Sequence, residues 1–133
     1  MTNEEQIRKL IDRWAIATRE GRKDDVLASH SEDALIFDTL PPLKYDTAAE
    51  YRQSLDKWWP DTAEGEGLFD LQGLRIIAGE NVAFAHAIVR CGGTTPDGQS
   101  FEDTMRLTHC LQISKDQWLI THSHTSMPVS IPQ

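Results

Sequence analysis

Asp38 stands where a general base could act. It directly follows the apolar run Ala34-Leu35-Ile36-Phe37 and precedes Pro41-Pro42, so we expect it at the end of a buried strand. Desolvation disfavours a charged carboxylate, and a carboxylate at an apolar mouth is therefore a better base toward a proton next to a carbonyl group. The other interpretation is an aspartate that caps a turn. Residue type and position leave both interpretations open.

Three histidines can meet if two hairpins close as their turn residues suggest. A two-residue loop at Asp97-Gly98 would place His86 opposite His109, and one at Asp116-Gln117 would place His109 opposite His124. Neighbouring cross-strand Cβ atoms lie roughly 5 Å apart, so the three imidazoles would form one row.

This row has three interpretations. The histidines could donate hydrogen bonds to a substrate oxygen, or each could be a separately hydrogen-bonded core or interface residue. They could also bind zinc or iron, because His122-Ser123-His124 places two histidines on one strand face. We expect no metal.

The same registers predict two different sheet faces. The predicted inner face is large and apolar, with Val82, Phe84, His86, Ile88, Met105, Leu107, His109, Leu111, Ile113 and Ile120. The predicted outer face is small and mixed, with Ala83, Ala85, Ala87, Thr104, Arg106, Thr108, Thr121, Ser123 and Thr125. Short side chains allow another sheet to approach closely. We therefore expect a homodimer through the outer face.

The elements that would position these residues are three helices followed by a meander. Apolar spacing, caps and stop residues predict helices over 4–20, 24–30 and 47–59, and a strand over 34–37. Turn signals divide 68–127 into four antiparallel strands. Trp14, Trp58 and Trp59 on the helices would either line a pocket or pack in the core. The fold class is α+β, a single domain over 1–133 with helices on one face of the sheet.

Composition excludes several classes of partner. The net charge is −8 and no Lys/Arg cluster is present, which argues against nucleic acid. No apolar run is long enough for a membrane helix, and the charged N-terminus does not resemble a signal peptide, so we expect a cytoplasmic protein. The two cysteines form no disulfide framework. No phosphate-binding or dinucleotide motif appears, so we expect no cofactor.

The first 38 residues resemble ketosteroid isomerase. Trp14, Gly21, Glu32-Asp33-Ala34 and Asp38 stand at the positions of that family's inward tyrosine, helix stop, strand entry and catalytic aspartate. Later stretches are similar to SnoaL-like proteins of the nuclear transport factor 2 superfamily; they are 38–43, 82–86, 106–108 and Trp118 followed by 122–128. The resemblance implies a cone-shaped, curved antiparallel sheet wrapped around three N-terminal helices.

The resemblance also implies a reaction class. We expect a cofactor-independent isomerase, cyclase or dehydratase-like enzyme that uses Asp38 as the base on a small apolar carbonyl compound. Trp14 replaces the family's tyrosine and His109 replaces its second aspartate, so His109, His124 or Trp14 would donate to the enolate oxygen. The predicted pocket lining is Trp14, Phe37, Trp58, His86, Leu111 and His122. The alternative is a non-catalytic small-molecule-binding or dimerisation domain of the same fold.

Overall fold

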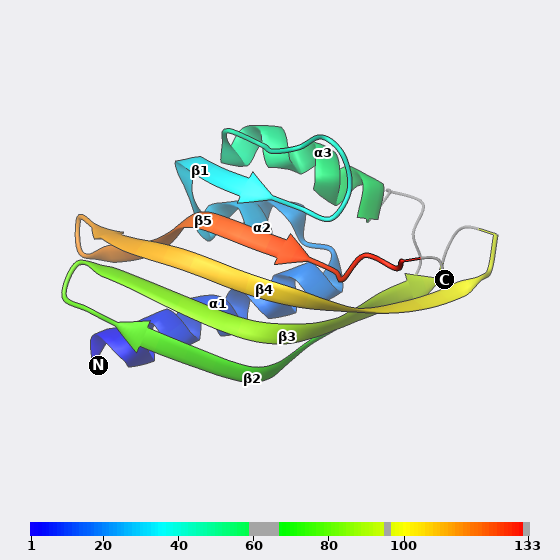
Figure 1. The fold of residues 1–133 in the computed structure, drawn as a ribbon. Helices are drawn as coiled ribbons and strands as arrows, with labels where there is room; N and C mark the ends of the chain where they lie inside the picture. The colour runs from blue at the N-terminus through cyan, green and yellow to red at the C-terminus, as the bar shows by residue number, and fades with distance from the viewer. Residues whose placement is uncertain (59–66, 95–96, 132–133) are drawn as a thin grey trace.

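The computed structural model describes residues 1–58, 67–94 and 97–131 and shows three helices beside a curved sheet (Figure 1). Its elements are α1 (Asn3–Glu20), α2 (Lys23–Ala28), β1 (His30–Phe37), α3 (Ala48–Trp58), β2 (Leu68–Ala78), β3 (Val82–Thr94), β4 (Ser100–Ser114) and β5 (Gln117–Ser126). The three predicted helices are confirmed, with ends that differ by one or two residues. Trp59 lies outside the described residues.

Helix α1 forms because its ends are capped and one face is apolar. The Thr2 side chain accepts a hydrogen bond from the Glu5 amide at 3.1 Å, and Gly21 ends the helix with a φ of 71°. The buried face carries Ile7, Leu10, Ile11, Trp14 and Ala17. This face packs against the sheet and forms the main apolar core with it.

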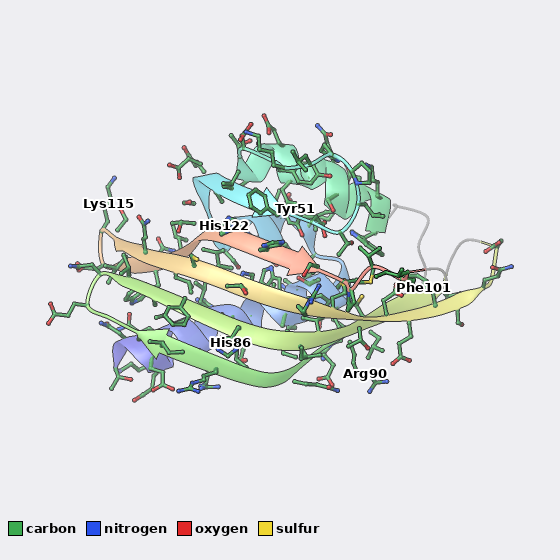
Figure 2. The ribbon with its side chains drawn as sticks, viewed as in Figure 1. Tyr51, His86, Arg90, Phe101, Lys115 and His122 are labelled. Atoms are coloured by element: carbon green, nitrogen blue, oxygen red, sulfur yellow. The ribbon has the colours of Figure 1, made fainter. Side chains whose placement is uncertain are left out.

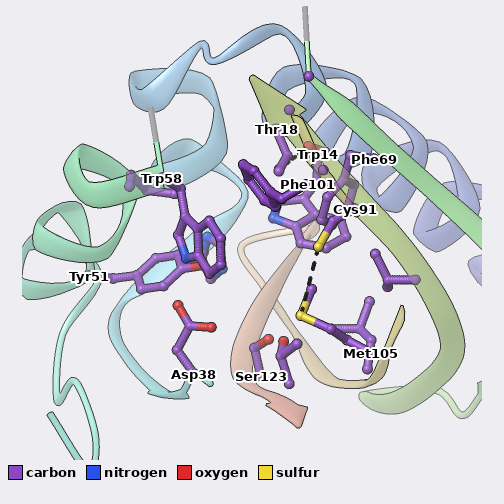
Figure 3. Close-up of a pocket in the computed structure, with 18 of the residues that line it drawn as sticks. Trp14, Thr18, Asp38, Tyr51, Trp58, Phe69, Cys91, Phe101, Met105 and Ser123 are labelled. Carbon is purple, nitrogen blue, oxygen red and sulfur yellow. Dashed lines mark hydrogen bonds between the residues drawn. The ribbon is translucent and has the colours of Figure 1, made fainter. Parts of the chain in front are cut away.

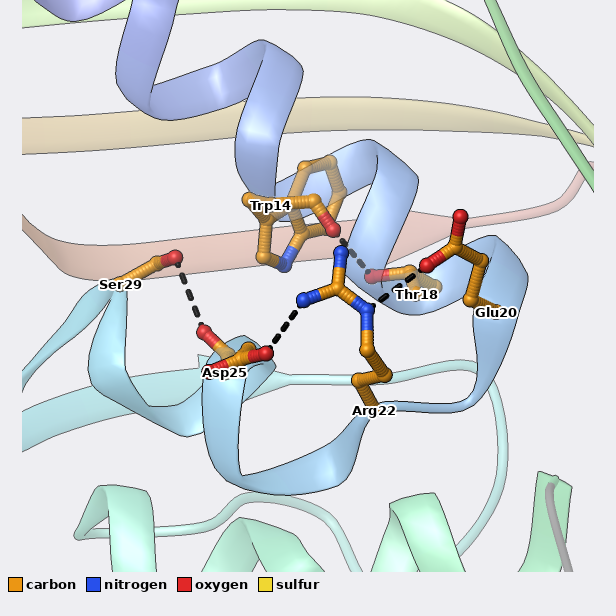
Figure 4. A network of polar contacts seen from close by, with 6 residues as sticks. All are labelled: Trp14, Thr18, Glu20, Arg22, Asp25 and Ser29. Carbon is orange, nitrogen blue, oxygen red and sulfur yellow. Dashed lines mark hydrogen bonds and ion pairs between the residues drawn. The ribbon is translucent and has the colours of Figure 1, made fainter.

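The turn from α1 to α2 is held by a short polar network (Figure 4). The Arg22 guanidinium contacts Glu20 at 2.7 Å and also Asp25, while the Thr18 hydroxyl donates to the Trp14 carbonyl at 2.8 Å. Helix α2 ends at Ala28 with Ser29 as its C-cap, and β1 begins at His30.

The sheet has the order β1-β5-β4-β3-β2. Strands β2 to β5 are antiparallel neighbours, which confirms the predicted meander. Strand β1 pairs in parallel with β5 and places Phe37 beside His124. Within the described ranges, no helix is long and apolar enough to cross a membrane.

Both predicted hairpin registers are wrong. Thr94 lies opposite Ser100, so the loop between β3 and β4 is longer than two residues. The loop between β4 and β5 is Lys115-Asp116, whose φ values of 52° and 61° match the two left-handed positions of a type I′ turn. A bulge between Cys110 and Leu111 shifts the register of β5 once more.

The predicted histidine row is therefore not formed. His109 lies opposite Ala85 and Ser123, whereas His86 and His124 both lie opposite Thr108. Because side chains alternate along a strand, each one-residue shift moves a side chain to the other face. His109 points inward and is 1% exposed. His124 and His86, the latter labelled in Figure 2, are exposed on the outer face of the sheet.

The predicted faces are right for β4 and wrong for β3. On β4, Met105, Leu107 and Leu111 point inward and are buried. Ile120 on β5 is buried on the same face. On β3 the alanines point inward, and the large residues Val82, Phe84 and Ile88 are exposed. Ser123 and Thr125 on β5 also face inward, against prediction. Large side chains of α1 fill the space over β3, so small residues fit beneath the helix.

Gly92 and Gly93 near the end of β3 give a stability prediction. A Cβ on Gly92 would lie 2.2 Å from the backbone oxygen of Phe101, whereas one on Gly93 would meet only the Phe101 ring, at 3.8 Å. We expect Gly92→Ala to lower the free energy of unfolding by about 1–3 kcal/mol. The matched Gly93→Ala should be neutral or slightly stabilising. Urea unfolding checks this, and equal midpoints would contradict it.

Candidate functional site

A cavity of about 90 Å³ lies between α1, α3 and the inner face of the sheet (Figure 3). Its aromatic lining consists of Trp14, Tyr51, Trp58, Phe69 and Phe101. Its polar lining consists of Thr18, His30, Asp38, Thr94, Ser123 and Thr125. The sulfur atoms of Cys91 and Met105, 3.9 Å apart, complete one wall. The site is therefore mainly apolar, with a few polar groups, as small-molecule sites usually are.

Asp38 is held on both carboxylate oxygens. It directly follows β1, and its Oδ1 accepts a hydrogen bond from the Thr39 amide at 2.8 Å. Its Oδ2 accepts one from the Ser54 hydroxyl on α3, which is 2% exposed. Each carboxylate oxygen has two lone pairs. Both oxygens thus keep accepting capacity while the carboxylate is fixed in the cavity wall.

The Tyr45 side chain lies next to Ser54 and Asp38. Its side chain is buried, and burial raises the pKa of its hydroxyl; Ser54 and Asp38 also act on it, Ser54 lowering the pKa and Asp38 raising it. The backbone of Tyr45 is paired with that of Ile36 on β1. The loop after β1 is therefore anchored next to the carboxylate.

Tyr51 presents a neutral hydroxyl near Asp38. Burial raises the pKa of Tyr51 far above its usual range, and the Asp38 charge raises it further. No hydrogen bond to the Tyr51 hydroxyl is formed by the part of the chain that the structure describes. Figure 3 shows the Tyr51 ring beside the Asp38 carboxylate. A tyrosine in this state can donate a hydrogen bond to a ligand oxygen over the whole physiological pH range.

His30 is the histidine that lines the cavity. Its Nδ1 lies 2.8 Å from the carbonyl oxygen of Val26, one helical turn earlier. Burial lowers the pKa of His30 to about 4, although the bond to Val26 opposes the shift. The ring is therefore neutral near pH 7.

His109 lies in the core against Trp14 and is not part of the lining. The two rings are edge to face, with centroids 4.5 Å apart. Neither ring nitrogen of His109 is accessible, and neither has a hydrogen-bond partner among the described residues. Burial lowers the pKa of His109 to about 3, with smaller contributions from His30 and His122. An enclosed imidazole cannot reach a ligand in this cavity.

The structure gathers three of the predicted site residues, Asp38, Trp14 and Trp58, around one cavity. The other predicted residues lie elsewhere. Leu111 is buried in the core and His86 is exposed on the outer face. The Phe37 ring lies 4.9 Å from the His122 ring and 5.3 Å from the His124 ring, measured between centroids, on the face away from the cavity.

His122 has a structural contact on that side. Its Nδ1 lies 2.7 Å from the Leu35 carbonyl oxygen, which ties β5 to β1. The histidines considered for a metal are thus divided between the two faces. Within the described ranges, no three His, Cys, Asp or Glu side chains are grouped as metal ligands would be.

The prediction missed His30 and Tyr51. Tyr51 could have been found from spacing, because it precedes Leu55 by four residues and so shares its helix face. His30 could not, because its position depends on where α2 ends and β1 begins. The lining from β3, such as Val89 and Cys91, is not predicted because the predicted register turns β3 over.

Comparisons with known proteins agree on family and fold. The model of the SnoaL-like domain family matches residues 7–130. An NTF2-like protein of unknown function from Pseudomonas putida KT2440 is 28% identical, with a TM-score of 0.84, over 98% of this chain and 92% of that chain. No curated protein matches the chain.

Two more distant structures share the fold alone. One, named provisionally as a scytalone dehydratase, comes from Novosphingobium aromaticivorans DSM 12444; it is 11% identical, with a TM-score of 0.79, over 92% of this chain and 81% of that chain. The other is the association domain of C. elegans CaMKII, 11% identical, with a TM-score of 0.72, over 93% of this chain and 95% of that chain.

Proposed function

The chain belongs to the SnoaL-like domain family, and on that basis we propose that its cavity binds a small, mainly apolar carbonyl compound and that Asp38 removes a proton next to the carbonyl group. The observation that carries the proposal is the Asp38 carboxylate, fixed by Ser54 and the Thr39 amide in an otherwise aromatic and sulfur-lined cavity. Such surroundings favour a base that is oriented and partly desolvated.

The proposed step is an enolisation. Asp38 takes the proton from the α-carbon, the electrons of the C–H bond form a C=C bond, and the carbonyl electrons move to oxygen. The Tyr51 hydroxyl donates a hydrogen bond to that oxygen, with the Trp14 indole N–H as a second candidate donor. We assign this role to Tyr51 rather than to His109 or His124, because His109 is enclosed and His124 lies on the other face.

Return of the proton from Asp38 to a different carbon would make the protein an isomerase. Loss of a β-hydroxyl group from the enolate as water, with the proton on Asp38 passed to the departing oxygen, would make it a dehydratase-like lyase. Neither outcome changes the oxidation state of the substrate overall, so the proposal includes no redox cofactor. The name of the Novosphingobium structure fits the second outcome, although its likeness extends to the fold alone.

The test is hydrogen–deuterium exchange at the α-carbon of a bound ketone in D₂O, followed by NMR. It detects proton abstraction without knowledge of the true product. Exchange above the buffer rate, lost when Asp38 is replaced, would support the enzyme. Ketones that bind without any exchange would favour the alternative, a non-catalytic small-molecule-binding domain of the same fold.

We also propose that two copies associate through the outer sheet face. This face exposes Val82, Phe84 and Ile88 on β3, with exposed fractions of 61%, 45% and 41%. In the described part of the chain no helix covers it (Figure 1). The fold it shares with an association domain is consistent with a second copy as the partner.

Sedimentation equilibrium checks this association at micromolar concentration. We expect a dimer for the wild type and a monomer for Phe84→Lys, because a charge in the centre of an apolar contact is left unpaired. The matched control is Val129→Lys, since Val129 is also exposed (86%) but follows the sheet. A wild-type monomer, or a dimer in both variants, would contradict the proposal.

A further inference from the structure

We propose that the cavity selects a ligand with a hydroxyl group, which donates a hydrogen bond to Nε2 of His30. This inference rests on the proposed function and adds a second polar group to the ligand, so the ligand class becomes hydroxy ketones with an apolar or aromatic body. It follows from the protonation state and the position of one ring nitrogen of His30.

The proton on the His30 ring is placed by the backbone. The Val26 carbonyl can only accept a hydrogen bond, and Nδ1 of His30 lies 2.8 Å from its oxygen. Nδ1 therefore donates. A neutral imidazole carries one ring proton, so Nε2 has a free lone pair and acts as an acceptor. The low pKa of His30 keeps the ring in this neutral form near pH 7.

The Nε2 atom is open to the cavity. The side chain is 6% exposed and belongs to the cavity lining. Nε2 makes no hydrogen bond with the described residues and, unlike both ring nitrogens of His109, is not fully enclosed. Because His30 lines the cavity, we infer that the open side of Nε2 faces the ligand space. A buried acceptor without a partner is unfavourable, and a ligand hydroxyl would satisfy it.

The surroundings of Nε2 determine the rest of the ligand. The His30 ring lies beside the Tyr51 ring, with centroids 5.9 Å apart, and Tyr51 in turn lies beside Asp38. Asp38 and Tyr51 thus lie together on one side of the cavity, with His30 beside Tyr51, while Phe69, Cys91 and Met105 line another part (Figure 3). A ligand with its hydroxyl and carbonyl groups close together and an apolar remainder matches this division.

His30 also limits the chemistry. Because Nε2 carries no proton, His30 can hold a hydroxyl group but cannot protonate it as a leaving group. His30 is therefore a specificity-determining residue and leaves the proton transfer to Asp38. Its removal should change which ketones bind more than how fast a bound ketone exchanges.

The test uses two ketones of nearly the same shape, 3-hydroxyacetophenone and 3-methylacetophenone, titrated by calorimetry. We expect the wild type to bind the hydroxy ketone about 10-fold or more tightly, as a hydrogen bond to a buried partner allows. His30→Phe keeps a flat ring without the acceptor, and the preference should disappear. Equal binding by the wild type, binding of neither ketone, or a preference that survives in His30→Phe would overturn the inference.

A measurement on the wild type covers the case in which His30→Phe does not fold. The ¹⁵N signals of His30 should show a protonated Nδ1 and an unprotonated Nε2. The hydroxy ketone should shift the Nε2 signal, and the methyl ketone should leave it unchanged. A proton on Nε2, or equal shifts with both ketones, would refute the inference.

The two proposals fail separately. Asp38→Asn should keep the preference for the hydroxy ketone in calorimetry while exchange is lost. Hydroxyl preference without exchange in the wild type would remove Asp38 as the base and leave His30 as the selective contact. Exchange without hydroxyl preference would keep Asp38 as the base and remove His30 as the selective contact.

Discussion

Replacement of Asp38 by asparagine is expected to lower the rate of α-proton exchange by about 10²–10⁴-fold, the usual contribution of a general base. Asparagine has nearly the same shape, and its amide oxygen can still accept a hydrogen bond from Ser54 or the Thr39 amide. It has no basicity with which to take the proton. The affinity for the ketone and the free energy of unfolding should therefore change little.

The matched control is Asp33→Asn. Asp33 lies on β1, five residues before Asp38, and is exposed to solvent. Asp33→Asn removes one negative charge from the chain, as Asp38→Asn does, so any long-range effect of net charge appears in both variants. NMR exchange rates at saturating ketone compare the two directly. Equal exchange in the wild type and Asp38→Asn would remove Asp38 from the mechanism.

The second large effect concerns stability in acid. Burial lowers the pKa of His30 to about 4 and that of His109 to about 3, while an unfolded histidine titrates near 6.5. Between these values the unfolded chain binds up to two more protons than the folded chain. Stability is therefore fully present above about pH 6.5 and decreases as the pH falls.

The loss should be on the order of 6 kcal/mol near pH 4, since each histidine contributes about 1.4 kcal/mol per pH unit until its folded form also binds a proton. This is on the order of the whole stability of a small domain, about 5–15 kcal/mol. Urea unfolding at a series of pH values measures it. We expect the midpoint to fall steeply below about pH 6.

Single substitutions show which histidine causes the loss of stability in acid. His109→Leu replaces an imidazole whose nitrogens have no partner in the described chain, so it should lose about half of the pH dependence. His30→Phe should lose the other half. His86→Gln, whose side chain is exposed on the outer face, should keep the wild-type slope. An unchanged slope in His109→Leu would show that His109 is not buried in its neutral form.

Local patterns in the sequence were sufficient for the helices. Helix α1 was predictable because its cap, its apolar spacing and Gly21 all lie within one segment. Asp38 was predictable for the same reason, since a polar residue directly after a buried apolar run must lie where the strand leaves the core. The family resemblance supported both predictions independently.

The registers could not be obtained in this way. Asp97-Gly98 and Asp116-Gln117 both look like two-residue loops, but the first hairpin is longer and the second turns at Lys115-Asp116. The first error shifts the register by one residue and turns β3 over. The second shifts it by two residues and keeps the faces, so only the bulge between Cys110 and Leu111 turns the rest of β5 over. Size alone predicts Phe84 and Ile88 inside, but both are exposed, and the alanines of β3 share the core with the large side chains of α1.

The α+β class, the order of helices and strands, and a carboxylate at the mouth of the core are predictable without coordinates, because each depends on residues close together in the chain. Only the tertiary structure determined which histidine meets the cavity. His109 and His30 are both buried, but the Val26 carbonyl orients one ring so that Nε2 faces ligand space, while the packing of Trp14 encloses the other. That difference arises from contacts between α1, α2 and the sheet, which no local pattern encodes.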